Sequence, residues 1–253
     1  MSSNMSSTPF TALPAAPQPP ASLRWWLLAG IALACAAPWV VYPMFLIKLM
    51  CLALLAASVN FLIGYAGLLS FGHAMFYGSA AYVTGFVAKD WGQDGVLAIL
   101  AGVGVAAGFG LLTGLLAIRR QGIYFSMITL AFAQMVYYIF ISLRKYGGED
   151  GINLPGQSRL PDFMSGISLA DDTTFYYAVL LIVVLCLMLL NRLVQSHFGQ
   201  ALQGIRENES RMQALGYPVM SIKLLAFVIA GGMAGLAGAL FANHNLFVSP
   251  AMM

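Results

Sequence analysis

Long apolar runs are the sequence feature that most limits what this chain can fold into. A helix of about 20 residues crosses a hydrocarbon core of about 30 Å. Because no water bonds the backbone there, each run must satisfy its own amide and carbonyl groups. Only 8% of the 253 residues are charged, against about 25% in a soluble domain. The runs are too long for barrel strands and do not alternate, so we predict an all-α, polytopic transmembrane helical bundle.

Seven apolar runs are candidate spans, at about 25–42, 44–63, 70–88, 96–118, 122–143, 174–190 and 222–243. The Ser/Pro/Ala-rich start cannot build a core, so residues 1–24 are predicted to be a disordered cytoplasmic tail before one transmembrane domain, 25–253. A signal peptide ending near Cys35 is a second interpretation of the first run. We rank it below a membrane span, because the preceding tail is long and another apolar run follows almost at once. Glycine pairs four residues apart predict close helix packing in spans four and seven: Gly104/Gly108, Gly110/Gly114 and Gly231/Gly235.

The Lys and Arg residues of the short loops predict the orientation, because cytoplasmic loops are rich in them. Arg119 and Arg120 lie between spans four and five. Four more basic residues lie between spans six and seven: Arg192, Arg206, Arg211 and Lys223. The loop between spans five and six is net acidic. We therefore predict a cytoplasmic N-terminus, two cytoplasmic basic loops and an external acidic loop.

A glycine-rich segment, 64–78, joins the second and third predicted spans. Glycine weakens a continuous helix, and broken helices often line a pathway in membrane proteins. An ionisable residue at membrane depth is a functional candidate, and a plain cytoplasmic turn is the alternative. Polar residues of span five either face the same pathway or bond to neighbouring helices: Tyr124, Ser126, Thr129 and Gln134. The candidate translocation-path residues are Asn60, Gly64, Gly67, Ser70, Gly72, His73, Thr129 and Gln134.

Residues 196–215 are not a span and are predicted to form one amphipathic helix. Its apolar residues recur at helical spacing: Phe198, Ala201, Leu202, Ile205, Met212 and Leu215. Ser196 is the expected N-cap, and Gly216 with Pro218 is a stop signal. Such a helix rests on the lipid interface or docks in a groove on a soluble partner. Mixed charges favour the protein partner.

A glycine-rich turn in the external loop, 146–152, carries two carboxylates. It either contacts a ligand or an outer partner, or is a solvated turn. The candidate contact residues are Gly148, Glu149, Asp150 and Gly151.

No motif predicts catalysis, a cofactor or a metal site. The chain lacks the phosphate loop G-x-x-x-x-G-K-[ST], H-E-x-x-H and G-x-S-x-G. Its cysteines, Cys35, Cys51 and Cys186, lie inside apolar runs without metal-ligand spacing. A net charge of +3 indicates no nucleic-acid partner. No predicted span contains Asp or Glu, which argues against the alternative of an ion-coupled secondary transporter.

Segments 64–85, 122–134, 147–156 and 198–242 resemble, in order, the permease subunits of branched-chain amino-acid ABC importers, especially the LivM type. The resemblance covers about residues 40–250. It implies an ABC-importer permease fold in a bacterial inner membrane. It also implies import of leucine, isoleucine and valine, with urea or short amides as alternatives in the same family. Relatives continue past residue 250 with further glycine-rich spans, so we expect a C-terminally short chain.

The resemblance also implies partners besides the lipid bilayer: a second related permease subunit, two cytoplasmic ATPase subunits and a periplasmic substrate-binding protein. In that family the segment matching 198–215 is the coupling helix that docks on the ATPase. In such importers ATP is hydrolysed on separate subunits, which agrees with the absence of a phosphate loop from this chain. The candidate coupling residues are Phe198, Gly199, Ala201, Gly204, Arg206 and Glu207.

Overall fold

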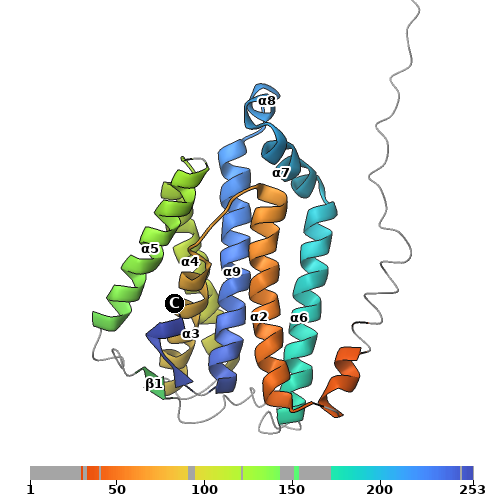
Figure 1. Cartoon of the computed structure of the whole chain (residues 1–253), viewed down its shortest axis with the longest axis vertical. Helices are drawn as coiled ribbons and strands as arrows, with labels where there is room; N and C mark the ends of the chain where they lie inside the picture. Colours follow the sequence, from red (N-terminus) through yellow and green to blue (C-terminus); the bar gives the residue numbers. More distant parts are fainter. Residues whose placement is uncertain are drawn as a thin grey trace, which may run out of the picture.

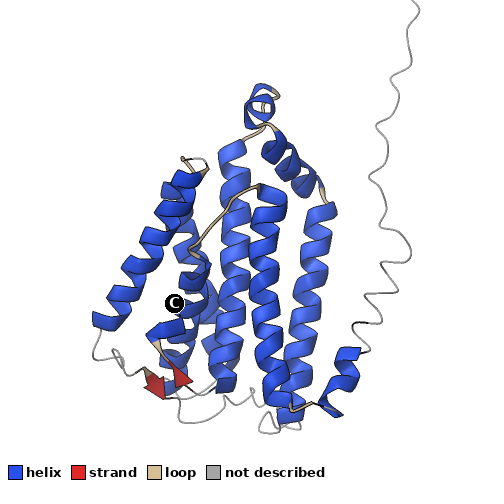
Figure 2. Cartoon of the chain, in the orientation of Figure 1, coloured by secondary structure: helices blue, strands red, loops and turns tan. Residues whose placement is uncertain are grey.

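The chain forms a bundle of roughly parallel and antiparallel helices (Figures 1 and 2). The computed structural model describes residues 30, 33–39, 41–90, 95–120, 122–142, 151–153, 172–245 and 247–252. Among these, five helices are long and apolar enough to cross a membrane: Pro43–Ala66, Gly95–Ala117, Ile123–Ser142, Thr173–Gln195 and Val219–Asn245. The prediction of an all-α polytopic bundle is confirmed.

The helices follow the predicted runs closely. They are α2 (Pro43–Phe61), α3 (His73–Asp90), α4 (Gly95–Ala117), α5 (Ile123–Ser142), α6 (Asp172–Gln195), α7 (His197–Glu207), α8 (Glu209–Ala214) and α9 (Val219–Asn245). Helix α2 begins with Pro43 at its first position, where a missing amide hydrogen costs nothing. It continues into a π-helical turn, η2 (Leu62–Ala66). The short elements are η1 (Ala37–Trp39), η6 (Pro250–Met252), β1 (Ile152–Asn153) and β2 (Phe247–Val248).

Two of the seven predicted spans are not among the five. The first part of 25–42 lies largely outside the described residues. Its later part lies beside the start of α6, where the Tyr176 hydroxyl donates to the Ala34 carbonyl at 2.6 Å. The third, 70–88, corresponds to α3, which begins at His73 and is less apolar than the other five. From Met75 to Gly85 every residue except Val83 is buried by protein. Because α3 faces other helices instead of lipid, it does not need a hydropathy as high as that of the five spans. The count of seven stays a prediction.

Helix α9 is the most enclosed of the five spans and packs against α2, α3 and α4. Its glycines allow this approach. A Cβ at Gly238 would overlap the backbone of Tyr77, and one at Gly235 would overlap Ala106. On α4, a Cβ at Gly114 would lie 2.7 Å from the Leu224 Cδ1 of α9, and one at Gly110 would make an ordinary contact with Val228 at 3.5 Å. No atom of the described residues lies within 4 Å of a Cβ built at Gly104 or Gly108. Two of the three predicted glycine pairs therefore form the central helix contacts.

The two ends of the bundle carry different structures. Helices α7 and α8 lie at one end, together with the turn between α4 and α5, and β1 lies at the opposite end (Figure 1). Strand β1 pairs antiparallel with β2, Ile152 opposite Val248, an addition to the all-α prediction. Both side chains are buried beside Ala81 and Tyr82. The segments containing the two basic loops therefore meet at one end, as the orientation argument requires.

Candidate functional site

The helical path is broken between α2 and α3, as the glycines predicted. The π-helical turn η2 ends at Gly67, which has a left-handed φ of 66°, a conformation that costs a side chain about 1–2 kcal/mol. Residues 68–72 are not helical. They run from the end of α2 toward the middle of the bundle, where α3 begins (Figure 1). Non-helical backbone at this depth is tolerated only where protein or a water-filled cavity surrounds it, and π-helical turns are frequent at functional sites.

This segment, 68–72, has one packed edge and one open edge. Leu68, Ser70 and Gly72 are buried. Leu69 and Phe71 alternate with them and are 46% and 57% exposed. Of the predicted path residues, Ser70 and Gly72 thus lie on the packed edge, where the Gly72 amide donates to the Ser70 hydroxyl at 3.2 Å.

Helix α5 holds the packed edge through two hydroxyl groups. The Ser126 hydroxyl donates to the Leu69 carbonyl at 2.6 Å, and the Phe71 amide donates to the Thr129 hydroxyl at 3.2 Å. A Cβ at Gly72 would lie 3.0 Å from the Thr129 carbonyl oxygen, so glycine keeps the backbones close. Thr129 was predicted at this site. Ser126 was noted among the polar residues of span five but left out of the candidate path residues, although its place three residues before Thr129 puts both on one helix face.

His73, the first residue of α3, faces aromatic rings rather than the open edge. It is 5% exposed. Its ring meets Phe76 and Phe227 edge-to-face, with centroids 5.7 and 6.5 Å away. Within the described chain neither ring nitrogen makes a hydrogen bond of normal geometry. The geometry therefore makes His73 part of the aromatic contact between α3 and α9.

Two other predicted path residues lie apart from this segment. Asn60 is exposed on α2 and lines a pocket of about 210 Å³ against α6, together with Asn191. Gln134 is exposed on α5. Gly64 follows Asn60 by one helical turn and belongs to η2. The structure thus divides the predicted set: Ser70, Gly72, His73 and Thr129 meet inside the bundle, whereas Asn60 and Gln134 do not join them.

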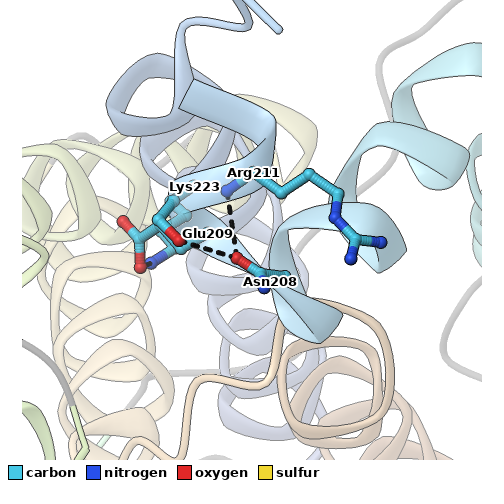
Figure 3. Close-up of polar contacts among 5 residues, drawn as sticks. Asn208, Glu209, Arg211 and Lys223 are labelled. Carbon is cyan, nitrogen blue, oxygen red and sulfur yellow. Dashed lines mark hydrogen bonds and ion pairs between the residues drawn. The ribbon is translucent and has the colours of Figure 1, made fainter. Parts of the chain in front are cut away.

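The predicted single helix over 196–215 is two helices, which corrects the prediction. Asn208 has φ −155° and ψ 100° and separates α7 from α8. Its side-chain oxygen accepts a hydrogen bond from the Arg211 amide at 3.0 Å and caps α8 (Figure 3), as asparagine commonly does. Ser196 occupies the N-cap position of α7, but its hydroxyl donates to the Leu193 carbonyl instead. Gly216, at φ 85°, and Pro218 follow α8 as predicted.

The apolar face of α7 packs on the chain's own bundle. Leu202 and Ile205 are 0% and 3% exposed, and Phe198 packs against the same core. This corrects the expectation that the apolar face meets lipid or a partner's groove. The face that α7 presents outward is polar: His197, Gln200, Gln203 and Glu207 are exposed. At the end of α8, Leu215 remains exposed.

The predicted coupling residues divide between packing and surface. A Cβ at Gly199 would overlap the Val194 backbone, so glycine permits the tight turn from α6 into α7. A Cβ at Gly204 would lie 3.0 Å from the Met212 sulfur, where α7 meets α8. Ala201 is half-buried and Glu207 is exposed.

Arg206 crosses from α7 to the broken helix. Its Nη1 donates to the Gly64 carbonyl, and its side chain lies over Gly67, where a Cβ would be 2.9 Å from the Arg206 Cγ. A cation beside the last carbonyls of a helix is favourable. Two regions predicted separately, the amphipathic segment and the glycine-rich segment, are therefore in direct contact.

An ion pair between a buried lysine and a partly exposed glutamate ties α8 to α9 at the same end. Lys223 is 5% exposed, and its Nζ lies 2.6 Å from a carboxylate oxygen of Glu209 (Figure 3). Both line a pocket of about 280 Å³ with Gly67 and Arg206. Figure 3 shows the Arg211 guanidinium pointing away from this pair.

The outer-loop candidates lie largely outside the described residues, which include Gly151 but not Gly148, Glu149 or Asp150. Gly151 has φ 75°, and a Cβ there would overlap the Val248 carbonyl oxygen. The pairing of β1 with β2 therefore explains why residue 151 is glycine.

A bundle of apolar helices interrupted by a non-helical segment is typical of polytopic proteins of the transport class. Residues 41–253 match the family described as the permease component of branched-chain amino acid transport systems. The chain belongs to this family. Together with the five apolar helices, this membership makes it a multi-pass inner-membrane protein.

Three relatives illustrate the family. The chain is 32% identical, over 78% of its length and 51% of the relative's, to the high-affinity branched-chain amino acid transport system permease protein LivM of Escherichia coli K12. It is 26% identical to a tyrosine transport system permease protein of Clostridioides difficile, over 60% of this chain and 48% of that one. It is 24% identical to a probable LivM permease of Methanocaldococcus jannaschii, over 76% and 64%. The chain thus spans about half the length of the first of these. No solved structure was found to match it.

Proposed function

We propose that this chain is a transmembrane permease subunit of an ATP-driven importer for leucine, isoleucine and valine. Segment 68–72 and the turn η2 line its translocation path, and α7 with α8 receives the motion of a separate ATPase. Family membership supports the transport role. The names of the LivM relatives support the substrate class.

The observation that carries the proposal is the direct contact between α7 and the broken helix. Arg206 of α7 bonds to the Gly64 carbonyl, and segment 68–72 follows from there into the bundle. A transport protein needs its energy-receiving element joined to backbone that changes conformation. The outward polar face of α7 is the surface we assign to the ATPase, because a polar face suits a partner that also exists in water.

The proposed orientation has a cytoplasmic N-terminus with the tail 1–24 on that side. The turn between α4 and α5 lies at the bundle end that carries α7 and α8 (Figure 1), and its sequence includes Arg119 and Arg120. Gathering of basic residues at one end supports a cytoplasmic assignment for it. The opposite end, with β1, then faces a periplasmic substrate-binding protein, for which Glu149 and Asp150, just before β1 in the sequence, are candidate contacts. A second, related permease subunit completes the membrane part.

Uptake by the intact importer tests the proposal. Cells lacking this subunit are complemented with the full chain and supplied with labelled leucine, isoleucine or valine, while unlabelled tyrosine and urea serve as competitors. We expect uptake to return only with the chain, and branched-chain amino acids to compete best. Unchanged uptake in the deletion strain refutes the branched-chain role, and dominant competition by tyrosine or urea reassigns the substrate.

Coupling is tested at α7. Gly204→Pro breaks the helix beside Met212, and Glu207→Arg reverses a charge on the outward face. We expect both variants to insert normally and to lose substrate-stimulated ATP hydrolysis in the purified complex. Normal stimulation in both variants contradicts the assignment of α7 to the ATPase.

A further inference from the structure

We propose that Arg206 is a positioning residue that transmits displacement of α7 to the broken helix between α2 and α3. The inference rests on the proposed function and adds a specific link to it. The link consists of two contacts by one side chain. The guanidinium binds the Gly64 carbonyl, and the aliphatic stem lies on Gly67.

The acceptor is a backbone group in a π-helical turn. Such a turn leaves carbonyl groups without the regular i to i−4 pairing, and a charged donor satisfies one of them. Hydrogen bonds to charged groups are stronger than neutral ones. Because the partner is backbone and not a flexible carboxylate, movement of the guanidinium acts on the helix path itself.

The stem contact depends on the conformation of Gly67. Gly67 has a φ of 66° and, as glycine, no side chain. A Cβ at this position would lie 2.9 Å from the Arg206 Cγ. The stem therefore reaches the backbone directly. Gly64 and Gly67 are three residues apart, so Arg206 contacts both the turn and the point where the chain leaves it.

The surroundings make the linked segment respond to α7. Arg206 follows Ile205, which is buried in the core, so the residue lies on an anchored helix. On the far side, Ser126 and Thr129 of α5 hold Leu69 and Phe71. The backbone from Gly64 to Leu69 thus lies between a contact on α7 and a contact on α5. When α7 moves relative to α5, this stretch of backbone is therefore the part that changes conformation first.

A reporter thiol on the open edge tests this link. Leu69→Cys is introduced into the chain with Cys35, Cys51 and Cys186 replaced by alanine. The complete importer is reconstituted, and the rate of thiol labelling is measured without nucleotide and after trapping with ATP and vanadate. The variants are Arg206→Ala, Arg206→Lys and the matched control Arg192→Ala, which removes an exposed arginine of α6 outside the coupling segment.

We expect the labelling rate to change on trapping in the parent and in Arg192→Ala. In Arg206→Ala we expect that change to shrink about tenfold, the size associated with one charge-assisted hydrogen bond. Arg206→Lys should recover part of it. An unchanged response in Arg206→Ala overturns the link and leaves the proposed function standing. Loss of response in Arg192→Ala as well shows a general charge effect and also overturns it. No response in the parent overturns both.

Discussion

At the centre of the bundle, α9 meets α3 and α4 at positions where no side chain fits, whereas at the α7–α8 end charged and polar side chains make contacts beside the apolar packing of α7. Gly235 and Gly238 exemplify the first kind, and Arg206 and the Glu209–Lys223 pair the second. Lipid supplies no hydrophobic force between helices, so close packing must hold the centre. Polar contacts at the end can exchange with water and form again. The difference suggests a rigid centre and an end that can be rearranged.

The largest effect is expected at the Glu209–Lys223 pair. Glu209→Gln leaves the buried Lys223 ammonium without its carboxylate. Because Glu209 is partly exposed, we expect the low end of the cost of breaking a buried pair, about 3 kcal/mol. We expect a lower free energy of unfolding in detergent-solubilised protein. The control is Glu207→Gln at an exposed site. An equal loss of unfolding free energy in both variants would show that the ion pair contributes no more than an exposed charge. The contacts at the α7–α8 end would then be equally weak.

Next in size is the packing of α9 on α3. Gly238→Ala places a methyl group against the Tyr77 backbone, and overpacking costs about 2 kcal/mol. The matched control is Gly232→Ala on the same helix, where no described atom lies within 4 Å of the new Cβ. Alanine there should raise stability by up to about 1 kcal/mol, because it favours helix. Unfolding measurements that give both variants the same sign would contradict the close packing of the centre, because the packed position would then behave like an open position of the same helix.

A smaller effect is expected at Gly67. Both Gly67→Ala and Gly122→Ala force a side chain to adopt a left-handed φ, 66° and 64°, at about 1 kcal/mol each. Only at Gly67 does the methyl group also displace Arg206. Gly67→Ala should therefore be the more destabilising, and the difference between the two free energies of unfolding measures the Arg206 contact. A zero difference would mean that the stem moves aside freely.

The smallest effect concerns the hydroxyl groups of α5. Ser126→Ala removes the donor to the Leu69 carbonyl at a cost of about 1 kcal/mol. Ser142→Ala, which removes a hydroxyl bonded within its own helix at an exposed site, should cost less. Thermal unfolding of the two purified variants checks this order. If Ser142→Ala is the more harmful, segment 68–72 is not held by α5.

The sequence predicted the spans well, because hydropathy is a property of each run alone. It also predicted the break near Gly67, since glycine acts locally on helix stability. It did not predict the break at Asn208, although asparagine before Glu209 is a usable helix-start signal. That signal was hidden because the apolar spacing continues from Ile205 to Met212 on either side of it. Ser126 was noted as a polar residue of span five but not chosen as a path candidate, because its role depends on Leu69, 57 residues away.

The sequence by itself determined that this chain crosses a membrane repeatedly as helices, because lipid sets the same requirement for every span. It also determined that α7 has an apolar and a polar face. Only the tertiary structure decided that the apolar face is covered by the chain's own core and that Arg206 binds the Gly64 carbonyl. The physical reason is that periodicity describes a helix relative to its own axis. Which neighbour covers each face depends on how distant segments pack together.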